Sequence, residues 1–97
     1  MGTFKKVSQQ TIIEYGYDNK NVIVIGREKR DAENKLESVE GNVYRKNEDG
    51  ERGEYICNFT GTVKDEKVKY AMSAIDIEDM GIVKSMMEEL EPNLKSN

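Results

Sequence analysis

Apolar and polar residues alternate with a period of two over most of residues 10–76, in stretches separated by short polar clusters. Such alternation predicts β-strands with one buried face, because successive side chains of a strand point to opposite sides of the sheet. The polar clusters at residues 18–21, 47–50 and 64–67 are typical of tight turns between neighbouring strands. We therefore expect about five antiparallel strands that follow one another as a meander.

The strands are expected to differ in how they are buried. Residues 22–25 read Val-Ile-Val-Ile, and a run that is apolar on both faces predicts a strand in the middle of the sheet, covered on each side. In the later strands only one face is apolar, and this face is expected to point into the core. Its side chains are Val39, Gly41 and Val43, then Tyr55, Cys57, Phe59 and Val63, and finally Val68, Tyr70, Met72 and Ala74.

The segment from Arg27 to Glu37 is almost entirely charged and admits two structures. One is a long hairpin tip between two strands, and the other is a short helix with Ala32, Leu36 and Val39 along its inner edge. We favour the hairpin. The basic residues at 27–30 are interrupted by a glutamate and followed by acidic residues, which predicts a solvated turn rather than a phosphate site.

The period changes at Asp76 to that of an α-helix. Apolar residues then recur at spacings of three and four, which places them on one stripe of the helix surface. Asp76 is expected to cap the N-terminus, and Pro92 is expected to end the regular helix near Glu91. The stripe consists of Ile77, Met80, Val83, Met87, Leu90 and Leu94.

The apolar surface of this helix is wider than one thin sheet face must cover. Ile82 and Met86 flank the main stripe on opposite sides, so part of this surface is available to a second chain. Ile82 and Met86 are therefore the candidate face for a homodimer. Gly81 costs helix stability relative to alanine, and we expect it to permit a close approach of the helix to the sheet.

Length and composition agree with one folded domain. The 97 residues include 36% hydrophobic and 35% charged side chains, so the core must be thin and most charge must lie in water. No run approaches the roughly eighteen apolar residues of a membrane span, and the N-terminus lacks a secretory signal. We expect a cytoplasmic α+β domain over residues 1–97, with an antiparallel meander of about five strands and one C-terminal amphipathic helix packed on the sheet.

The chain contains no histidine and a single cysteine, Cys57. Without histidine, catalytic arrangements of the Ser-His and Cys-His type are excluded, and the commonest metal ligand is missing. Cys57 cannot form an intramolecular disulfide and is expected to be a buried apolar residue. Carboxylates such as Glu14 and Glu40 lie in polar stretches, where no apolar pocket sets them apart as acid–base groups. We therefore expect no enzyme activity and neither a cofactor nor a metal ion.

The net charge of −4 indicates the kind of partner that this domain would bind. It opposes binding to nucleic acids and to anionic membranes, whereas complementary charge speeds association with a basic protein. We expect a noncatalytic protein-binding module, of the inhibitor or immunity type found in phages and bacteria, that presents acidic surface to a basic partner. The candidate partner-binding residues are Glu48, Asp49, Glu51, Asp65, Glu66, Glu88, Glu89 and Glu91.

Two alternatives stay open. In one, the meander curls into a barrel that binds a small molecule in a pocket lined by tyrosine, methionine and valine side chains. In the other, the domain is a structural subunit of a larger assembly, which composition does not separate from a binding module.

Overall fold

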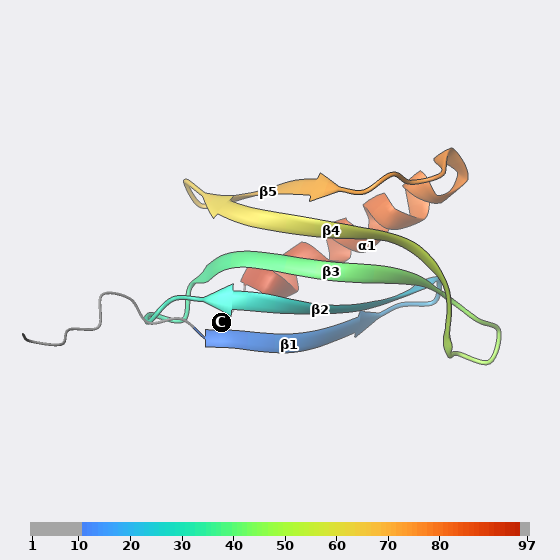
Figure 1. Cartoon of the computed structure of the whole chain (residues 1–97), viewed down its shortest axis with the longest axis horizontal. Coiled ribbons are helices and arrows are strands. Elements are labelled where there is room, and N and C mark those ends of the chain that lie inside the picture. The colour runs from blue at the N-terminus through green and yellow to red at the C-terminus, as the bar shows by residue number, and fades with distance from the viewer. Residues whose placement is uncertain (1–10, 96–97) are drawn as a thin grey trace, which may run out of the picture.

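The computed structural model describes residues 11–95, which form one five-stranded antiparallel sheet and a C-terminal helix (Figure 1). The strands follow one another across the sheet in chain order, so the expected meander and the α+β class are confirmed. The sheet has β1 and β5 at its two edges. The elements are β1 (Thr11–Asp18), β2 (Val22–Arg30), β3 (Leu36–Lys46), β4 (Arg52–Lys64), β5 (Lys67–Met72), the 3₁₀ turn η1 (Ile77–Asp79) and α1 (Met80–Lys95).

The charged segment between β2 and β3 is a hairpin, as favoured from the sequence, and not a short helix. Its turn covers only residues 31–35. The Asp31 carboxylate closes this turn by accepting hydrogen bonds from the backbone N–H groups of Glu33 and Lys35, at 2.8 and 2.9 Å. Asn34 adopts a left-handed backbone with φ 66°, which asparagine tolerates better than most residues. Local turn chemistry therefore determines this connection.

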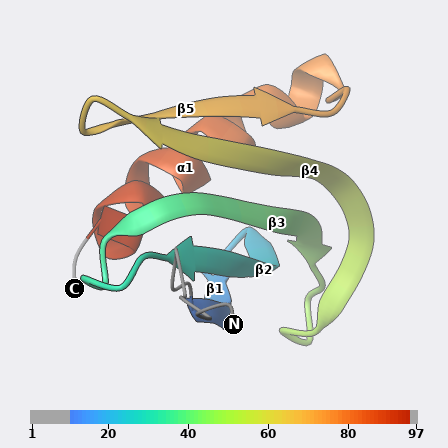
Figure 2. The same cartoon turned by 60° about the vertical axis from the view of Figure 1, so that its left-hand side comes forward.

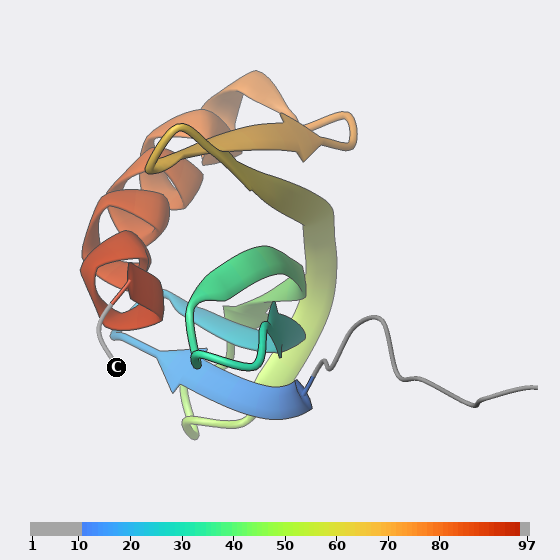
Figure 3. The same ribbon diagram turned by 90° about the vertical axis from the view of Figure 1, so that its left-hand side faces the viewer.

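The helix α1 packs against one face of the sheet, and the hydrophobic core lies between them (Figures 2 and 3). Every second side chain of β2, β3 and β4 points toward the helix, as the alternation predicts. The register places Val24 opposite Val43, and Val43 opposite Cys57. The buried apolar side chains are Val22, Val24, Val39, Val43, Cys57, Phe59, Val83, Met86, Met87, Leu90 and Leu94.

The other face of the sheet is not covered by any element of residues 11–95, and we call it the open face. Val22 and Val24 are fully buried, but Ile25 on the open face is 44% exposed. In addition, β2 lies next to the edge strand β1 and not in the middle of the sheet. The expectation of cover on both sides of residues 22–25 was wrong within the described part of the chain, because residues 11–95 supply one α-helix and this helix covers one face.

The apolar stripe of the helix enters the core later than expected. Ile77 and Met80 are 87% and 55% exposed. Residues 77–79 form a 3₁₀ turn, in which three residues per turn change the phase of the stripe. Met86 is fully buried in the core, and Ile82 is partly buried against the same core. The dimer face expected at Ile82 and Met86 is therefore wrong for Met86, which packs within its own chain.

The ends and interior of the helix differ in part from the expectations. Asp76 stands at the N-cap position, as expected, but its main-chain carbonyl, and not its side chain, accepts the first hydrogen bond of the 3₁₀ turn. The helix continues through Pro92, because Leu94 beyond it is buried on the same stripe and packing outweighs the missing N–H group. Nothing lies within 4 Å of where a Cβ would stand on Gly81, so this glycine does not mark a close approach to the sheet.

β4 bends strongly, and its irregular pairing with β3 turns one tyrosine outward (Figure 2). The register skips Ile56, so Tyr55 pairs with Tyr44, as in a β-bulge. Tyr55 is consequently 48% exposed on the open face, and the expectation that it faces the core was wrong. Met72 and Ala74 are exposed as well, because β5 ends at Met72 and the chain then turns away toward the helix.

Polar contacts hold the helix against both edges of the sheet. The Glu89 carboxylate accepts hydrogen bonds from the Tyr17 hydroxyl at 3.0 Å and from the Asn19 amide at 3.1 Å. The Glu91 carboxylate accepts a hydrogen bond from the Tyr70 hydroxyl at 2.9 Å. Tyr17 belongs to β1 and Tyr70 to β5, so two glutamates of one helix turn fasten the two edge strands.

A buried arginine joins the end of the helix to the β2–β3 hairpin. Arg30 is 4% exposed. Its Nη2 donates to the main-chain carbonyl of Leu94 at 2.7 Å, its Nη1 donates to that of Asn34 at 2.9 Å, and its Nε donates to the Glu28 carboxylate at 3.2 Å. The solvated turn expected at residues 27–30 was therefore wrong. Residues 27–30 are the last residues of β2. The Arg30 side chain points toward the C-terminus of the helix, where the helix dipole favours a positive charge.

Candidate functional site

The acidic residues predicted to bind a partner lie at separate places. Glu48, Asp49 and Glu51 lie in and beside the turn between β3 and β4, whereas Asp65 and Glu66 form the turn between β4 and β5. The two turns lie at opposite ends of the sheet, and all five residues are exposed (Figure 1). The structure therefore does not bring these two clusters together into one acidic surface.

The three acidic residues predicted on the helix differ in their surroundings. Glu88 is exposed and makes no hydrogen bond or ion pair within residues 11–95. Glu89 and Glu91 are the residues that bind Tyr17 and Tyr70 at the edges of the sheet. These two carboxylates stabilise the packing of the helix, which is a structural role that composition alone did not reveal.

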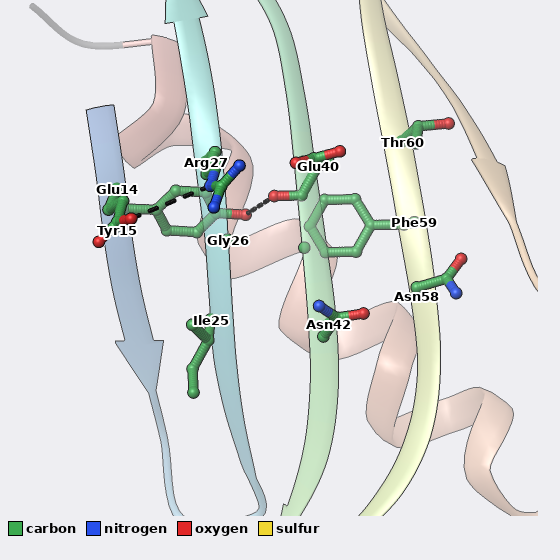
Figure 4. Close-up of a pocket in the computed structure, with 11 residues that line it drawn as sticks. Glu14, Tyr15, Ile25, Gly26, Arg27, Glu40, Asn42, Asn58, Phe59 and Thr60 are labelled. Carbon is green, nitrogen blue, oxygen red and sulfur yellow. Dashed lines mark hydrogen bonds and ion pairs between the residues drawn. The ribbon is translucent and has the colours of Figure 1, made fainter. Parts of the chain in front are cut away.

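A hollow of about 760 Å³ lies on the open face of the sheet, across β1, β2, β3 and β4, and we call it the trough (Figure 4). Its floor is the main chain where β2 and β3 pass through Gly26 and Gly41. Charged and amide groups predominate among the side chains around it. The open-face residues that line it are Glu14, Ile25, Arg27, Glu40, Asn42, Asn58 and Thr60.

The glycines of the floor are required by aromatic rings on the helix side of the sheet. Gly26 and Gly41 are direct neighbours in β2 and β3. A Cβ on Gly41 would lie 2.7 Å from the Phe59 ring and 2.9 Å from the Tyr15 hydroxyl oxygen, and a Cβ on Gly26 would meet the Tyr15 ring at 2.8 Å. A side chain at Gly41 would displace the Phe59 ring and the Tyr15 hydroxyl. A side chain at Gly26 would collide with the main-chain carbonyl oxygen of Glu40 as well as with the Tyr15 ring.

Tyr15 is held in this position by its hydroxyl group. The hydroxyl donates to the main-chain carbonyl of Glu40 at 3.1 Å. Burial of the ring, and secondly the negative charges of Glu28 and Glu40, raise the pKa of Tyr15. The neutral hydroxyl therefore supports the floor of the trough as a hydrogen-bond donor.

One row of side chains crosses the trough from β1 to β4. Glu14 lies opposite Arg27, Arg27 lies opposite Glu40, and Glu40 lies opposite Thr60. The Nε of Arg27 is 4.0 Å from a carboxylate oxygen of Glu14, and both side chains are largely exposed. The row therefore combines two carboxylates with one guanidinium group.

An aromatic pair stands on the same face beside the trough. The Tyr44 and Tyr55 rings meet edge to face with centroids 5.7 Å apart, and the Arg52 guanidinium lies 4.9 Å above the Tyr44 ring. The Asn58 amide donates to the Tyr55 hydroxyl at 2.8 Å. These contacts connect the aromatic pair to the wall of the trough.

A second hollow of about 290 Å³ continues the trough toward the β2–β3 turn. It shares Arg27, Glu40 and Thr60 with the first hollow and adds Ile12 and Lys29. The open face is thus a continuous polar surface, with Ile12 and Ile25 as exposed aliphatic side chains on its β1–β2 side.

The space expected for a ligand-binding barrel is not formed. The edge strands β1 and β5 are separated by the other three strands, so the sheet is open. The volume between sheet and helix is filled by core side chains such as Phe59, Met86 and Leu90. The trough lies on the outside of the sheet, on the face away from the helix.

Cys57 is fully buried, as expected from its place in an apolar run. Burial, and secondly the charge of Asp79, raise the pKa of the thiol, which keeps it protonated. Among residues 11–95, no three cysteine or carboxylate side chains gather where they could hold a metal ion. No helix in this range is long and apolar enough to cross a membrane.

Comparisons of the chain with protein-family models, with curated proteins and with solved structures give no match. The geometry of the open face is consequently the main source of information about function. The residues of the trough are scattered in the sequence, and only Glu14 and Glu40 among them stood out, as ordinary carboxylates of polar strand faces. Counting outward from the β1–β2 turn pairs Glu14 with Arg27. The register of β2 and β3 shifts by one residue between Lys29 and Arg30, so counting from the β2–β3 turn would have paired Arg27 with Val39 and missed Glu40.

Proposed function

We propose that this protein is a noncatalytic protein-binding module that holds a basic segment of a partner protein in the trough. The observation that carries this proposal is the sheet face that no element of residues 11–95 covers, with its hollow of about 760 Å³. A sheet that is covered on one side has its other face in water, and in this protein that face is hollowed and carries exposed Ile25 and Tyr55 side chains.

The composition of the open face supports a protein partner. Tyrosine and arginine are enriched at protein interfaces, and here Tyr44, Tyr55, Arg27 and Arg52 stand on or beside the trough. Sites for small molecules are mostly enclosed and apolar, whereas among residues 11–95 Ile25 is the only aliphatic side chain that lines the trough. A polar, half-open surface of this kind fits an exposed protein segment better than a small apolar ligand.

The charge of the trough favours a basic segment. Two glutamates and one arginine line it, and the whole chain carries a net charge of −4. Opposite charge on the partner would speed the encounter and orient the two surfaces. A module of the inhibitor or immunity type acts in this way when the bound segment belongs to the basic substrate site of the partner.

A tryptophan placed in the trough tests this proposal. Thr60 is exposed on the open face, so Thr60→Trp fills the hollow without entering the core. Ser85 is exposed on the helix, on the other side of the molecule, so Ser85→Trp adds the same bulk away from the trough. With a partner captured from the cell of origin, we expect Thr60→Trp to weaken binding about tenfold or more, as measured by calorimetry. Equal binding by the two variants would refute the proposal.

A further inference from the structure

The row of side chains across the trough carries two negative charges and one positive charge, so its net charge is −1. Arg27 stands between Glu14 and Glu40 in the strand register. Its guanidinium pairs with Glu14 at 4.0 Å, and within residues 11–95 no hydrogen bond or ion pair reaches the Glu40 carboxylate. Lys29, the nearest further cation on the face of β2, lies in the next row, opposite Ser38. One guanidinium therefore has two carboxylates to compensate.

The cost of burying Glu40 restricts what can cover the trough. In water the free carboxylate is well solvated, but a partner that covers it removes that water. An unpaired carboxylate buried in an interface weakens binding strongly, and only a cation or several hydrogen-bond donors on the partner can offset this loss. Because Glu40 lines both hollows of the open face, a segment that fills the trough cannot avoid it.

The surroundings of Glu40 favour a guanidinium over an ammonium group. Asn42 stands two residues further along the same face of β3 and lines the same hollow, so its amide oxygen is a second acceptor (Figure 4). The floor beneath is the main chain at Gly26 and Gly41, without side chains that would obstruct a planar group. A guanidinium offers several donors in one plane and is more weakly hydrated than an ammonium group.

We propose that Glu40 is the specificity-determining residue of the trough and selects a partner segment that places an arginine side chain over Gly26 and Gly41. This inference rests on the proposed function and deepens it, because it names the side chain that the basic segment must carry. The Glu40 carboxylate receives the guanidinium in a charge-assisted pair, and Asn42 accepts from a remaining N–H group.

An arginine hexapeptide and a lysine hexapeptide of equal charge are the probes for this inference. The variant is Glu40→Gln, which preserves the main-chain carbonyl that Tyr15 binds and therefore leaves the floor intact. The matched control is Glu78→Gln, the same change at an exposed residue of the 3₁₀ turn η1, outside the trough. Affinity is measured by fluorescence anisotropy, and the binding surface is located from NMR shifts of the Asn42 and Asn58 side-chain amides.

We expect the arginine peptide to bind the wild-type protein several-fold more tightly than the lysine peptide, with shifts at both asparagine amides. Glu40→Gln should weaken arginine binding about tenfold and remove the preference, whereas Glu78→Gln should change the affinity by less than about twofold. Equal losses in the two variants, equal affinity for the two peptides, or shifts centred on the hairpin turns would overturn the inference.

Binding of the natural partner to the Thr60→Trp and Glu40→Gln variants distinguishes failure of this inference from failure of the proposed function. If Thr60→Trp blocks the partner and Glu40→Gln does not, the trough binds protein but Glu40 does not select arginine, and the inference is overturned alone. If neither variant affects the partner, the proposed function fails as well. If both weaken binding, the two proposals stand together.

Discussion

Arg30 shows how strongly one buried charged residue can tie distant parts of this chain together. It contacts the last turn of the helix through Leu94, the β2–β3 turn through Asn34, and Glu28 on its own strand. Its guanidinium has these partners in a buried position, so the charge is both paired and hydrogen-bonded. Removing the side chain would take a hydrogen-bond donor away from both the Glu28 carboxylate and the main-chain carbonyl of Leu94.

We therefore predict that Arg30→Ala lowers the free energy of unfolding by about 3 kcal/mol, the usual cost of breaking a buried ion pair. Urea denaturation followed by circular dichroism measures this loss. The matched control is Arg27→Ala, since Arg27 is an exposed arginine of the same strand with a pair at 4.0 Å. Its loss should stay below about 1 kcal/mol, and a similar loss in both variants would contradict a special role for Arg30.

At the scale of elements, the helix depends on tyrosines from both edge strands. Tyr17 of β1 and Tyr70 of β5 donate to Glu89 and Glu91, which stand two residues apart on α1. Tyr70 also packs edge to face against Phe59, with ring centroids 6.1 Å apart. Its ring therefore belongs to the core, while its hydroxyl binds the helix through Glu91. The helix is thus anchored by its apolar stripe in the middle and by hydrogen bonds at its flanks.

The hydrogen bond from the Tyr70 hydroxyl to Glu91 predicts that the folded protein loses stability at alkaline pH. Burial, then the hydrogen bond to Glu91 and its charge, raise the pKa of Tyr70 above its ordinary value of 10.0. The folded state holds the phenol proton more tightly than the unfolded chain does. The contribution of this group is therefore complete below pH 10 and declines as the pH rises further, while the unfolded chain ionises.

We expect the free energy of unfolding of the wild-type protein to fall more steeply above pH 10 than that of Tyr70→Phe. The variant lacks the hydroxyl, so it is less stable at pH 8 but has lost this source of pH dependence. Urea titrations of both proteins between pH 8 and pH 11 provide the comparison. If the free energies of unfolding of the two proteins fall in parallel with pH, the Tyr70 hydroxyl is not held by Glu91 in solution.

At the scale of the whole molecule, negative charge is distributed over several surfaces. The two hairpin turns that carry Glu48, Asp49, Asp65 and Glu66 point away from opposite ends of the sheet. The trough lies between them on the open face. Charge at such distances contributes to the long-range field of the molecule more than to direct contacts, and this field is screened by salt.

We therefore predict that the association rate constant with a basic partner falls about tenfold between roughly 0.05 and 0.5 M ionic strength, with a smaller change in dissociation. Stopped-flow fluorescence measures both rates. Replacing Glu48, Asp49 and Glu51 together by lysine should also slow association and leave the fold intact. An association rate that is insensitive to salt would contradict a steering role for the acidic charge.

The sequence by itself determined the elements of this fold and their order. Alternation with a period of two, the polar turn clusters at residues 18–21, 47–50 and 64–67, and the change of period at Asp76 are local properties, so they could be recognised from a few neighbouring residues. The hairpin turns also imply the meander, since a tight turn joins strands that are adjacent and antiparallel. The absence of histidine is likewise a property of composition alone.

Only the tertiary structure decided which residues meet. One β-bulge turned Tyr55 outward, one 3₁₀ turn took Ile77 out of the core, and the strand register brought Glu14, Arg27 and Glu40 into one row. The bulge and the register depend on contacts between distant strands, and a shift by one residue reverses the face on which a side chain lies. The trough results from that register, so no local pattern in the sequence predicts it.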